Sequence, residues 1–355
     1  MKIKLALISA DVFYLSRIEN ALKSQYADKF DLICFSDYEL ATQKLGKEVK
    51  ADLAVADEAF DYSFAFKREG CIKAYFSDSN DVDSFNELPC IGKYQRLDSF
   101  VRQLLKLYAE QSDSNLVFRT SLDSGCKTVA FVSAAGGVGT STAAAAFAKR
   151  KQKDGYASFY LNFEPFGTSD IFFSGQGESN FSNIIFALKS NKANLALKIE
   201  SEVNKSHEGV SFFGDCKIAL DRTTFSYEEQ KKLIDAIKST GKYVYIVADT
   251  AFSLSENYIN LLNSFSVIVF VSDGSDIANA KTAQAVSALD ILESQQDNLR
   301  ILDKSVLLCN KCDGRAVERI ENIPLSVIGS VERIRGLRSV ELSARMCEKE
   351  AFGKI

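Results

Sequence analysis

The residues best suited to chemistry form a run of glycines and hydroxyls at residues 135–142, AGGVGTST. Val129–Ser133 before it is a short apolar segment that predicts a buried strand, and the alanine-rich segment from Thr140 or Ser141 predicts a helix. A strand, a glycine loop and a helix together bind phosphate, because backbone N–H groups turn inward and the helix N-terminus is positive. We expect a nucleotide to be held by Gly136, Gly137, Val138, Gly139, Thr140, Ser141 and Thr142, and Mg²⁺ by the Ser141 hydroxyl. The alternative is a glycine turn in some other α/β protein.

The loop departs from the pattern G-x-x-x-x-G-K-[ST], because Ala134 and Thr140 stand where glycine and lysine are required. It resembles the deviant loop of the MinD/ParA ATPases, K-G-G-x-G-K-[ST]. That resemblance implies that the residue at Ala135 would be a lysine that reaches the partner's nucleotide across a dimer, and this lysine is also missing. A cation on the transferring phosphate is worth orders of magnitude in rate, so we expect binding to survive better than turnover.

Acidic residues follow two further predicted strands. Glu164 comes after Ala157–Leu161, where the MinD/ParA resemblance implies a D-x-D segment whose second acid orients the attacking water; Asn162 replaces the first acid. Asp249 ends the apolar strand Tyr243–Ala248, and an aspartate there holds Mg²⁺ through water, opposite the hydroxyl of the glycine loop. We therefore expect Glu164 as the catalytic carboxylate, and Ser141 with Asp249 as the metal site.

The segment Asn310-Lys311-Cys312-Asp313 follows another predicted strand, Ser305–Cys309. It admits two interpretations. N-K-x-D is the guanine-reading motif of P-loop GTPases, whereas in the MinD/ParA group an asparagine at this point contacts adenine. Because the glycine loop resembles the second group, the expected ligand is ATP with Mg²⁺, bound partly by Asn310. The pair Cys309 and Cys312 has no second pair or nearby histidine, so both thiols are expected to pack in the core.

The first hundred residues alternate predicted strands and helices, a pattern that implies a parallel, doubly wound sheet. Four polar residues fall just past strand ends: Asp11, Asp57, Ser77 and Lys93. The arrangement resembles a response-regulator receiver domain. In that family the residue at Asp57 accepts a phosphoryl group, an acidic pair binds Mg²⁺, and the serine and lysine contact the phosphate. Here Asp11 has Ala10 beside it instead of a second acid, so the domain is either a phosphorylated switch or a receiver-shaped docking module.

The whole chain of 355 residues is long enough for two α/β domains. The expected fold is two doubly wound domains: a receiver-like (flavodoxin-like) domain at 1–108, a linker at 109–126, and a MinD/ParA-type P-loop domain at 127–355. The net charge of −4 gives no overall positive field that would attract nucleic acid, so no nucleic-acid partner is expected. Eight irregularly spaced cysteines indicate free thiols in the cytoplasm, and neither a membrane span nor a secretion leader is expected.

A receiver-like domain joined to a loop reading S-A-A-G-G-V-G-T-S-T, followed by N-F-E-P-F-G-T-S-D, resembles the TadZ/CpaE proteins of Tad pilus assembly. The resemblance implies a cytoplasmic, ATP-binding homodimer, recruited to the inner membrane or a cell pole through partners, that assembles pilus and secretion proteins with slow or no hydrolysis. Two other functions remain open: a ParA-like ATPase that partitions DNA, and a two-component output regulator switched by phosphorylation at Asp57.

Overall fold

The computed structural model describes residues 2–45, 47–65, 71–79, 82–111, 125–174, 180–190, 195–312 and 323–355. The chain divides into two compact units. The first unit comprises Met1–Arg119 and Ser190–Ser201, and the second comprises Thr120–Lys189 and Glu202–Ile355. Most of the segment expected as a linker, residues 112–124, lies outside the described residues. Each unit contains one sheet flanked by helices, so the expected α/β class is confirmed.

The sheet of the first unit has the strand order β2-β1-β3-β4-β6-β5, in which only the short edge strand β5 is antiparallel to its neighbour. The predicted alternation of strands and helices is therefore confirmed in this unit. Its strands are β1 (Ile3–Ile8), β2 (Phe30–Phe35), β3 (Leu53–Ala56), β4 (Ile72–Ser77), β5 (Ser84–Phe85) and β6 (Leu88–Gly92).

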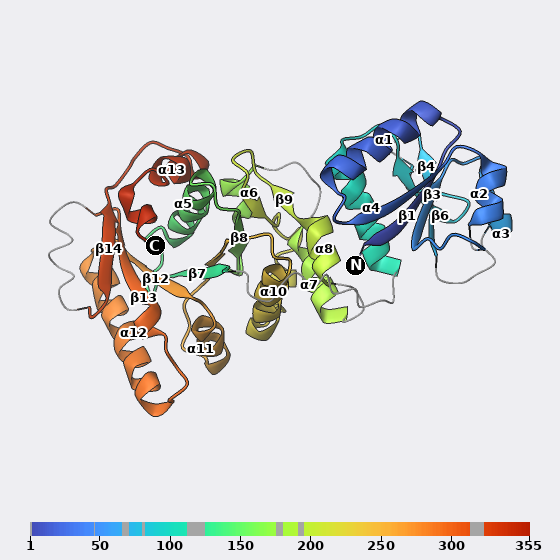
Figure 1. The fold of residues 1–355 in the computed structure, drawn as a ribbon. Coiled ribbons are helices and arrows are strands. Elements are labelled where there is room, and N and C mark those ends of the chain that lie inside the picture. Colours follow the sequence, from blue (N-terminus) through green and yellow to red (C-terminus); the bar gives the residue numbers. More distant parts are fainter. Residues whose placement is uncertain are drawn as a thin grey trace. The chain divides into compact units, whose positions relative to one another are not determined.

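Helices pack on both faces of this sheet (Figure 1). One face forms a core with residues of α1 and α4, and the other forms a core with residues of α2 and α3. The helices are α1 (Val12–Gln25), α2 (Tyr38–Lys44), α3 (Tyr62–Ala65) and α4 (Leu97–Gln111). Asp11 and Asp37 begin α1 and α2 as N-caps, because their carboxylates accept hydrogen bonds from otherwise unpaired backbone N–H groups.

A fifth helix of the first unit, α8 (Leu195–Glu202), comes from a distant part of the chain. Its sequence neighbours are mostly polar, as in a surface segment, but part of this helix is buried. Leu197 is fully buried among the core residues of the first unit, and Ile199 is also buried. Lys29 and Glu200 form an ion pair whose side chains are only 12% and 15% exposed. The apolar residues of this short helix alternate with charged ones, so the sequence shows no apolar helix face that would predict burial.

The second unit contains an eight-stranded sheet of order β14-β13-β12-β7-β11-β8-β10-β9. All its pairings are parallel except that of β9 with β10. The strands are β7 (Lys127–Val132), β8 (Ser158–Asn162), β9 (Asn204–Lys205), β10 (Ser211–Phe212), β11 (Tyr245–Asp249), β12 (Val267–Ser272), β13 (Ser305–Asn310) and β14 (Ser326–Val331). Because β7, β8, β11 and β13 are parallel, their carboxyl ends lie at one edge, and the candidate residues follow these ends.

In Figure 1, α5 and α13 cover one face of this sheet, and α10, α11 and α12 cover the other. The larger helices are α5 (Thr140–Lys153), α7 (Phe181–Ser190), α10 (Tyr227–Ser239), α11 (Glu256–Asn263), α12 (Asp276–Gln295) and α13 (Ser339–Met346), and α6 (Ser169–Phe172) and α9 (Leu220–Thr223) are single turns. A core of alanines from α5 packs on the central strands, which lets this helix approach the sheet closely. No helix of the described residues is long and apolar enough to cross a membrane.

Candidate functional site

The glycine loop lies between β7 and α5, as predicted. Gly137 and Gly139 have φ angles of 77° and 91°, a left-handed conformation that glycine adopts without steric cost. A Cβ on Gly139 would also overlap the Asn310 side-chain amide. Gly139 is the N-cap of α5, which begins at Thr140 with the unpaired N–H groups of its first turn. The loop therefore has the backbone geometry of an anion-binding turn.

The two positions that lack lysine have different surroundings. Ala135 is buried in the core cluster of the second unit, with 8% of its surface exposed. Thr140 is partly exposed at the first position of α5. Because no cationic side chain stands at either position, phosphate at the loop would meet N–H groups, the hydroxyl groups of Ser141 and Thr142, and cations supplied by other segments.

Asp249 ends β11 as a completely buried carboxylate. Its Oδ2 accepts hydrogen bonds from the Tyr160 hydroxyl at 3.1 Å and the Asn162 amide at 3.0 Å. Its Oδ1 has no hydrogen-bond partner of normal geometry in the described part of the chain. Burial, and then the charge of Glu164, raise the pKa of Asp249 to about 7, although the Ser141 hydroxyl and Tyr160 oppose the shift. The buried charge of this aspartate is thus only partly compensated, because the nearby Ser141 hydroxyl and the charge of Arg222 do not outweigh the effect of burial.

Glu164 is half-buried in the loop after β8, and burial raises the pKa of its carboxyl group, while the Ser141 hydroxyl and Arg222 lower it. Ser141 lies in the first turn of α5, and its hydroxyl lowers the pKa of both acids, while the charge of Glu164 raises that of Asp249, so the three groups interact. Oxygen ligands of this kind suit Mg²⁺, which takes few protein ligands and keeps water and phosphate oxygens. The structure thus brings together the residues expected for a magnesium site, and the unpaired Oδ1 of Asp249 fits such an ion.

Arg222 is a site residue that the sequence analysis missed. It is buried on α9 and donates from Nη1 to the backbone oxygens of Asn162 at 2.7 Å and Glu164 at 3.2 Å. Its Nη2 pairs with Asp215 at 3.2 Å, and Asp215 in turn accepts from the backbone N–H of Ser169. Arg222 therefore holds the loop that carries Glu164 through groups about 60 positions away in sequence, a relation that no local pattern indicates.

Asn310 and Lys311 reach the glycine loop from the end of β13. The Asn310 amide is buried and donates to the Val138 carbonyl at 2.7 Å, and the Lys311 ammonium donates to the Gly137 carbonyl at 2.5 Å. The contact of Asn310 with a base stays a prediction, because the observed role of its amide is to hold the loop. Asp313, the last residue of the N-K-x-D motif, lies outside the described residues. Cys309 and Cys312 are buried, as predicted.

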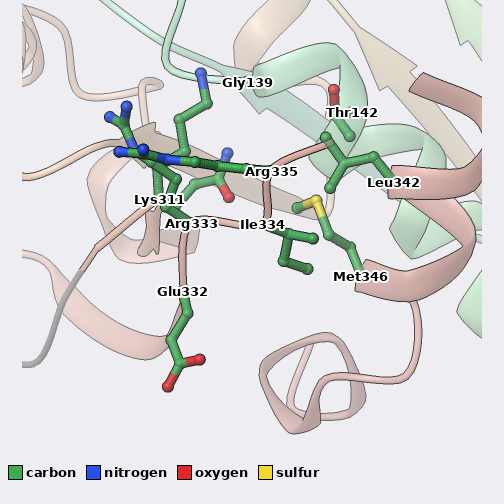
Figure 2. A pocket seen from close by; sticks show the side chains of 10 residues that line it. Gly139, Thr142, Lys311, Glu332, Arg333, Ile334, Arg335, Leu342 and Met346 are labelled. Atoms are coloured by element: carbon green, nitrogen blue, oxygen red, sulfur yellow. The ribbon is translucent and has the colours of Figure 1, made fainter. Parts of the chain in front are cut away.

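A cavity of about 270 Å³ opens beside the glycine loop (Figure 2). Figure 2 shows basic side chains gathered on one side of it and apolar side chains on the other. The lining residues are Gly139, Thr142, Asn310, Lys311, Glu332, Arg333, Ile334, Arg335, Leu342 and Met346. An apolar wall beside cationic groups can accept a flat base on one side and anionic groups on the other. The basic residues Arg333 and Arg335 were not identified from the sequence.

Two of the four residues expected as a phosphoacceptor site, Asp57 and Lys93, contact each other at the strand ends of the first unit. Oδ1 of Asp57 pairs with Lys93 at 2.6 Å, and Oδ2 accepts from the Tyr38 hydroxyl and the Ala10 N–H, both at 2.9 Å. Burial by itself would raise the pKa of Asp57, but hydrogen bonds from Lys93, Ser9 and Tyr38, and from the Ala10 N–H, together lower it. The charge of this carboxylate is thus compensated by groups of its own unit.

The other two residues of the expected phosphoacceptor site, Asp11 and Ser77, make local hydrogen bonds instead. Asp11 accepts from the Tyr14 N–H as the N-cap of α1, and the Ser77 hydroxyl donates to the Ser79 carbonyl. Tyr38, which contacts Asp57, was not identified from the sequence. The structure therefore assembles Asp57 and Lys93, while Asp11 and Ser77 stand near them with local structural roles. Their part in phosphorylation stays a prediction.

Comparisons with known proteins agree with this division. Residues 1–109 match the family model of the TadZ-like receiver domain. No curated protein matches the chain. A similar solved structure is a ParA family ATPase from Chlorobium tepidum TLS, with 18% identity, a TM-score of 0.52, and coverage of 64% of this chain and 98% of that chain. Another is the septum site-determining protein MinD complexed with Mg-ADP from Pyrococcus horikoshii OT3, with 15% identity, a TM-score of 0.50, and coverage of 64% and 93%. At these identities the similarity establishes the fold.

Proposed function

From a TadZ-like receiver domain at residues 1–109 and a ParA- and MinD-like fold in the second unit, we propose that this protein is an ATP-binding platform for Tad pilus assembly. It binds Mg-ATP at the glycine loop and hydrolyses it slowly or not at all. The nucleotide-bound form is a homodimer that recruits pilus and secretion proteins. It works in the cytoplasm and reaches the inner membrane or a cell pole through those partners.

The observation that carries the proposal is the buried Asp249, which has one satisfied and one unpaired carboxylate oxygen beside Ser141 and the glycine loop. Leaving a buried anion partly unpaired is costly, and a cation that binds there would remove this cost. Mg²⁺ would be held by Ser141 and Asp249 and by the nucleotide. When bound, the ion would supply positive charge that neutralises the phosphates.

Slow turnover follows from the positions that lack lysine. The Ala135 side chain is buried, and Thr140 carries no charge, so neither can stabilise charge that develops on a transferring phosphoryl group. Arg222 is held by backbone carbonyls and by Asp215, and therefore positions the Glu164 loop. The backbone N–H groups of the loop still bind phosphate, so we expect affinity without efficient catalysis.

Calorimetric titration of the full chain with ATP and GTP, with and without Mg²⁺, tests the binding. We expect Mg-dependent binding of ATP and turnover at least a hundredfold below that of an ordinary ATPase of this fold assayed in parallel. Comparable turnover would contradict the slow-hydrolysis part of the proposal. Imaging of a fluorescent fusion tests the platform role: focal localisation that is lost in a strain without the pilus machinery is expected, and uniform distribution in the intact strain would contradict it.

A further inference from the structure

The triphosphate site lacks a cation at the positions where this loop usually carries one. Ala135 and Thr140 leave the glycine loop with N–H groups and hydroxyls only. A nucleoside triphosphate nevertheless brings several negative charges, and Mg²⁺ neutralises two of them. A second source of positive charge next to the loop would remove the remaining deficit, and the described residues contain a candidate that comes from another strand.

Lys311 is held at the loop by an unusual backbone conformation. Its φ angle is 57°, and the other described residues that combine a positive φ with a side chain, Asn86 and Glu87, form the turn between β5 and β6. A long side chain is rarely found in this left-handed conformation, and such strain concentrates at functional sites. Here the conformation directs the ammonium group onto the Gly137 carbonyl, while the preceding Asn310 holds Val138.

The charge of Lys311 helps to lower the pKa of Asp273, but these two described side chains form no ion pair, so the ammonium group can still act on a ligand. In the part of the chain that the structure describes, Lys311 makes no ion pair, and neither do Arg333 and Arg335 on the same side of the cavity. Glu332 also lines the cavity, but in Figure 2 its carboxylate points away from the three basic groups. The cavity thus has a net positive side that begins at the glycine loop.

We propose that Lys311 supplies the phosphate-binding positive charge that the glycine loop has lost. The inference rests on the proposed nucleotide binding and specifies which residue makes it possible. The ligand class is a nucleoside polyphosphate, recognised through its phosphates rather than its base. Lys311 carries the main effect because it alone of the three basic residues bonds to the loop itself; Arg333 and Arg335, exposed on the loop after β14, add a weaker field.

Titration of the full chain with Mg-ATP at about 50 mM and about 500 mM salt tests this role. We expect Lys311→Gln to weaken binding about ten- to a hundredfold at low salt, as for loss of a charged hydrogen-bond donor, and much less at high salt, where the charge is screened. Lys311→Arg should retain most of the affinity. Lys231→Gln, which removes the same charge from exposed α10, is the matched control and should bind like the unmodified chain. Thermal unfolding without nucleotide shows that each variant is folded.

The outcomes separate the two proposals. If the unmodified chain binds Mg-ATP and Lys311→Gln binds it equally well, the role of Lys311 is overturned and nucleotide binding stands. A loss of the same size at both salt concentrations also overturns it, because Lys311 would then act by holding the shape of the loop. If the unmodified chain binds no triphosphate, the proposed function and the role of Lys311 both fall.

Discussion

Two aspartates at strand ends, Asp57 in the first unit and Asp249 in the second, have opposite environments. Asp57 pairs with Lys93 and accepts hydrogen bonds from the Tyr38 hydroxyl and the Ala10 N–H. These contacts lower its pKa. Asp249 is completely buried, has an unpaired oxygen, and has a pKa raised to about 7. The first carboxylate is stabilised by an ion pair within its own unit, whereas the second forms no ion pair among the described residues, and the charge of Arg222 offsets its burial only in part. This contrast supports our proposal that a cation binds at the second site, whereas the acid of the first unit is already paired within that unit.

The largest expected effect is on ligand binding. Asp249→Asn keeps the size of the side chain and removes the charge that would hold Mg²⁺, so Mg-ATP affinity should fall about ten- to a hundredfold, as for partners that orient a metal site. Asp57→Asn is the matched control and should bind Mg-ATP like the unmodified chain. Calorimetric titration measures both variants. Equal losses in the two variants would contradict the contrast between the aspartates.

The next effect concerns the loop that brings Glu164 to Asp249. A methyl group on Gly167 would overlap Arg222 and Asp215, so Gly167→Ala should lower the stability of the second unit by about 1–3 kcal/mol, the usual cost of overpacking. Gly125→Ala serves as the control, because its Cβ would meet nothing within 4 Å. Denaturant unfolding followed in the second unit measures the difference, and a Gly167→Ala protein as stable as the control would show that the Arg222 contacts do not fix this loop.

A smaller effect is a pH dependence with a defined sign. The raised pKa of Asp249 means that the folded state binds a proton that the unfolded state has already released, so stability falls as pH rises through about 7. Without Mg²⁺ and nucleotide, the second unit should be about 1.4 kcal/mol more stable at pH 6 than at pH 8, from this group alone. Thermal unfolding at the two pH values measures it.

The pH effect has its own control. Asp249→Asn should abolish that gain at pH 6, and Asp57→Asn should not, since the lowered pKa of Asp57 contributes stability that is lost only as pH falls below the ordinary carboxyl range. If Asp249→Asn is still more stable at pH 6 than at pH 8 by the same amount, another group is responsible for the pH dependence.

The smallest expected effect is in the first unit. Tyr38→Phe removes one of the hydrogen bonds to Asp57 and should destabilise this unit by about 1 kcal/mol. Because the Tyr38 hydroxyl also occupies an oxygen of Asp57, the variant should accept phosphate from acetyl phosphate at least as readily as the unmodified chain does. Asp57→Asn, which has no acceptor carboxylate, provides the background for labelling. Weaker labelling of Tyr38→Phe than of the unmodified chain would contradict this prediction. Strong labelling of the unmodified chain itself would indicate that Asp57 is a working phosphoacceptor.

The sequence predicts the parts of the molecule that depend on local patterns. Val129–Ser133 and the alanines after Thr140 place the glycine loop between a strand and a helix, and Asp57 and Asp249 follow apolar strands. The long-range parts were not predictable. Arg222 reaches the Glu164 loop across about 60 positions, and the left-handed backbone of Lys311 leaves no signature in the residue types around it. Leu197 is buried because α8 packs into the core of the first unit. The alternation of apolar and charged residues in α8 does not show that the helix belongs to this unit.

Calorimetric titration of Mg-ATP into the full, unmodified chain at low salt tests the central claim most directly, namely that a glycine loop without lysine still binds a triphosphate. We expect a saturable heat of binding that requires Mg²⁺ and is lost in Asp249→Asn. The absence of any heat with millimolar ATP or GTP would contradict the claim.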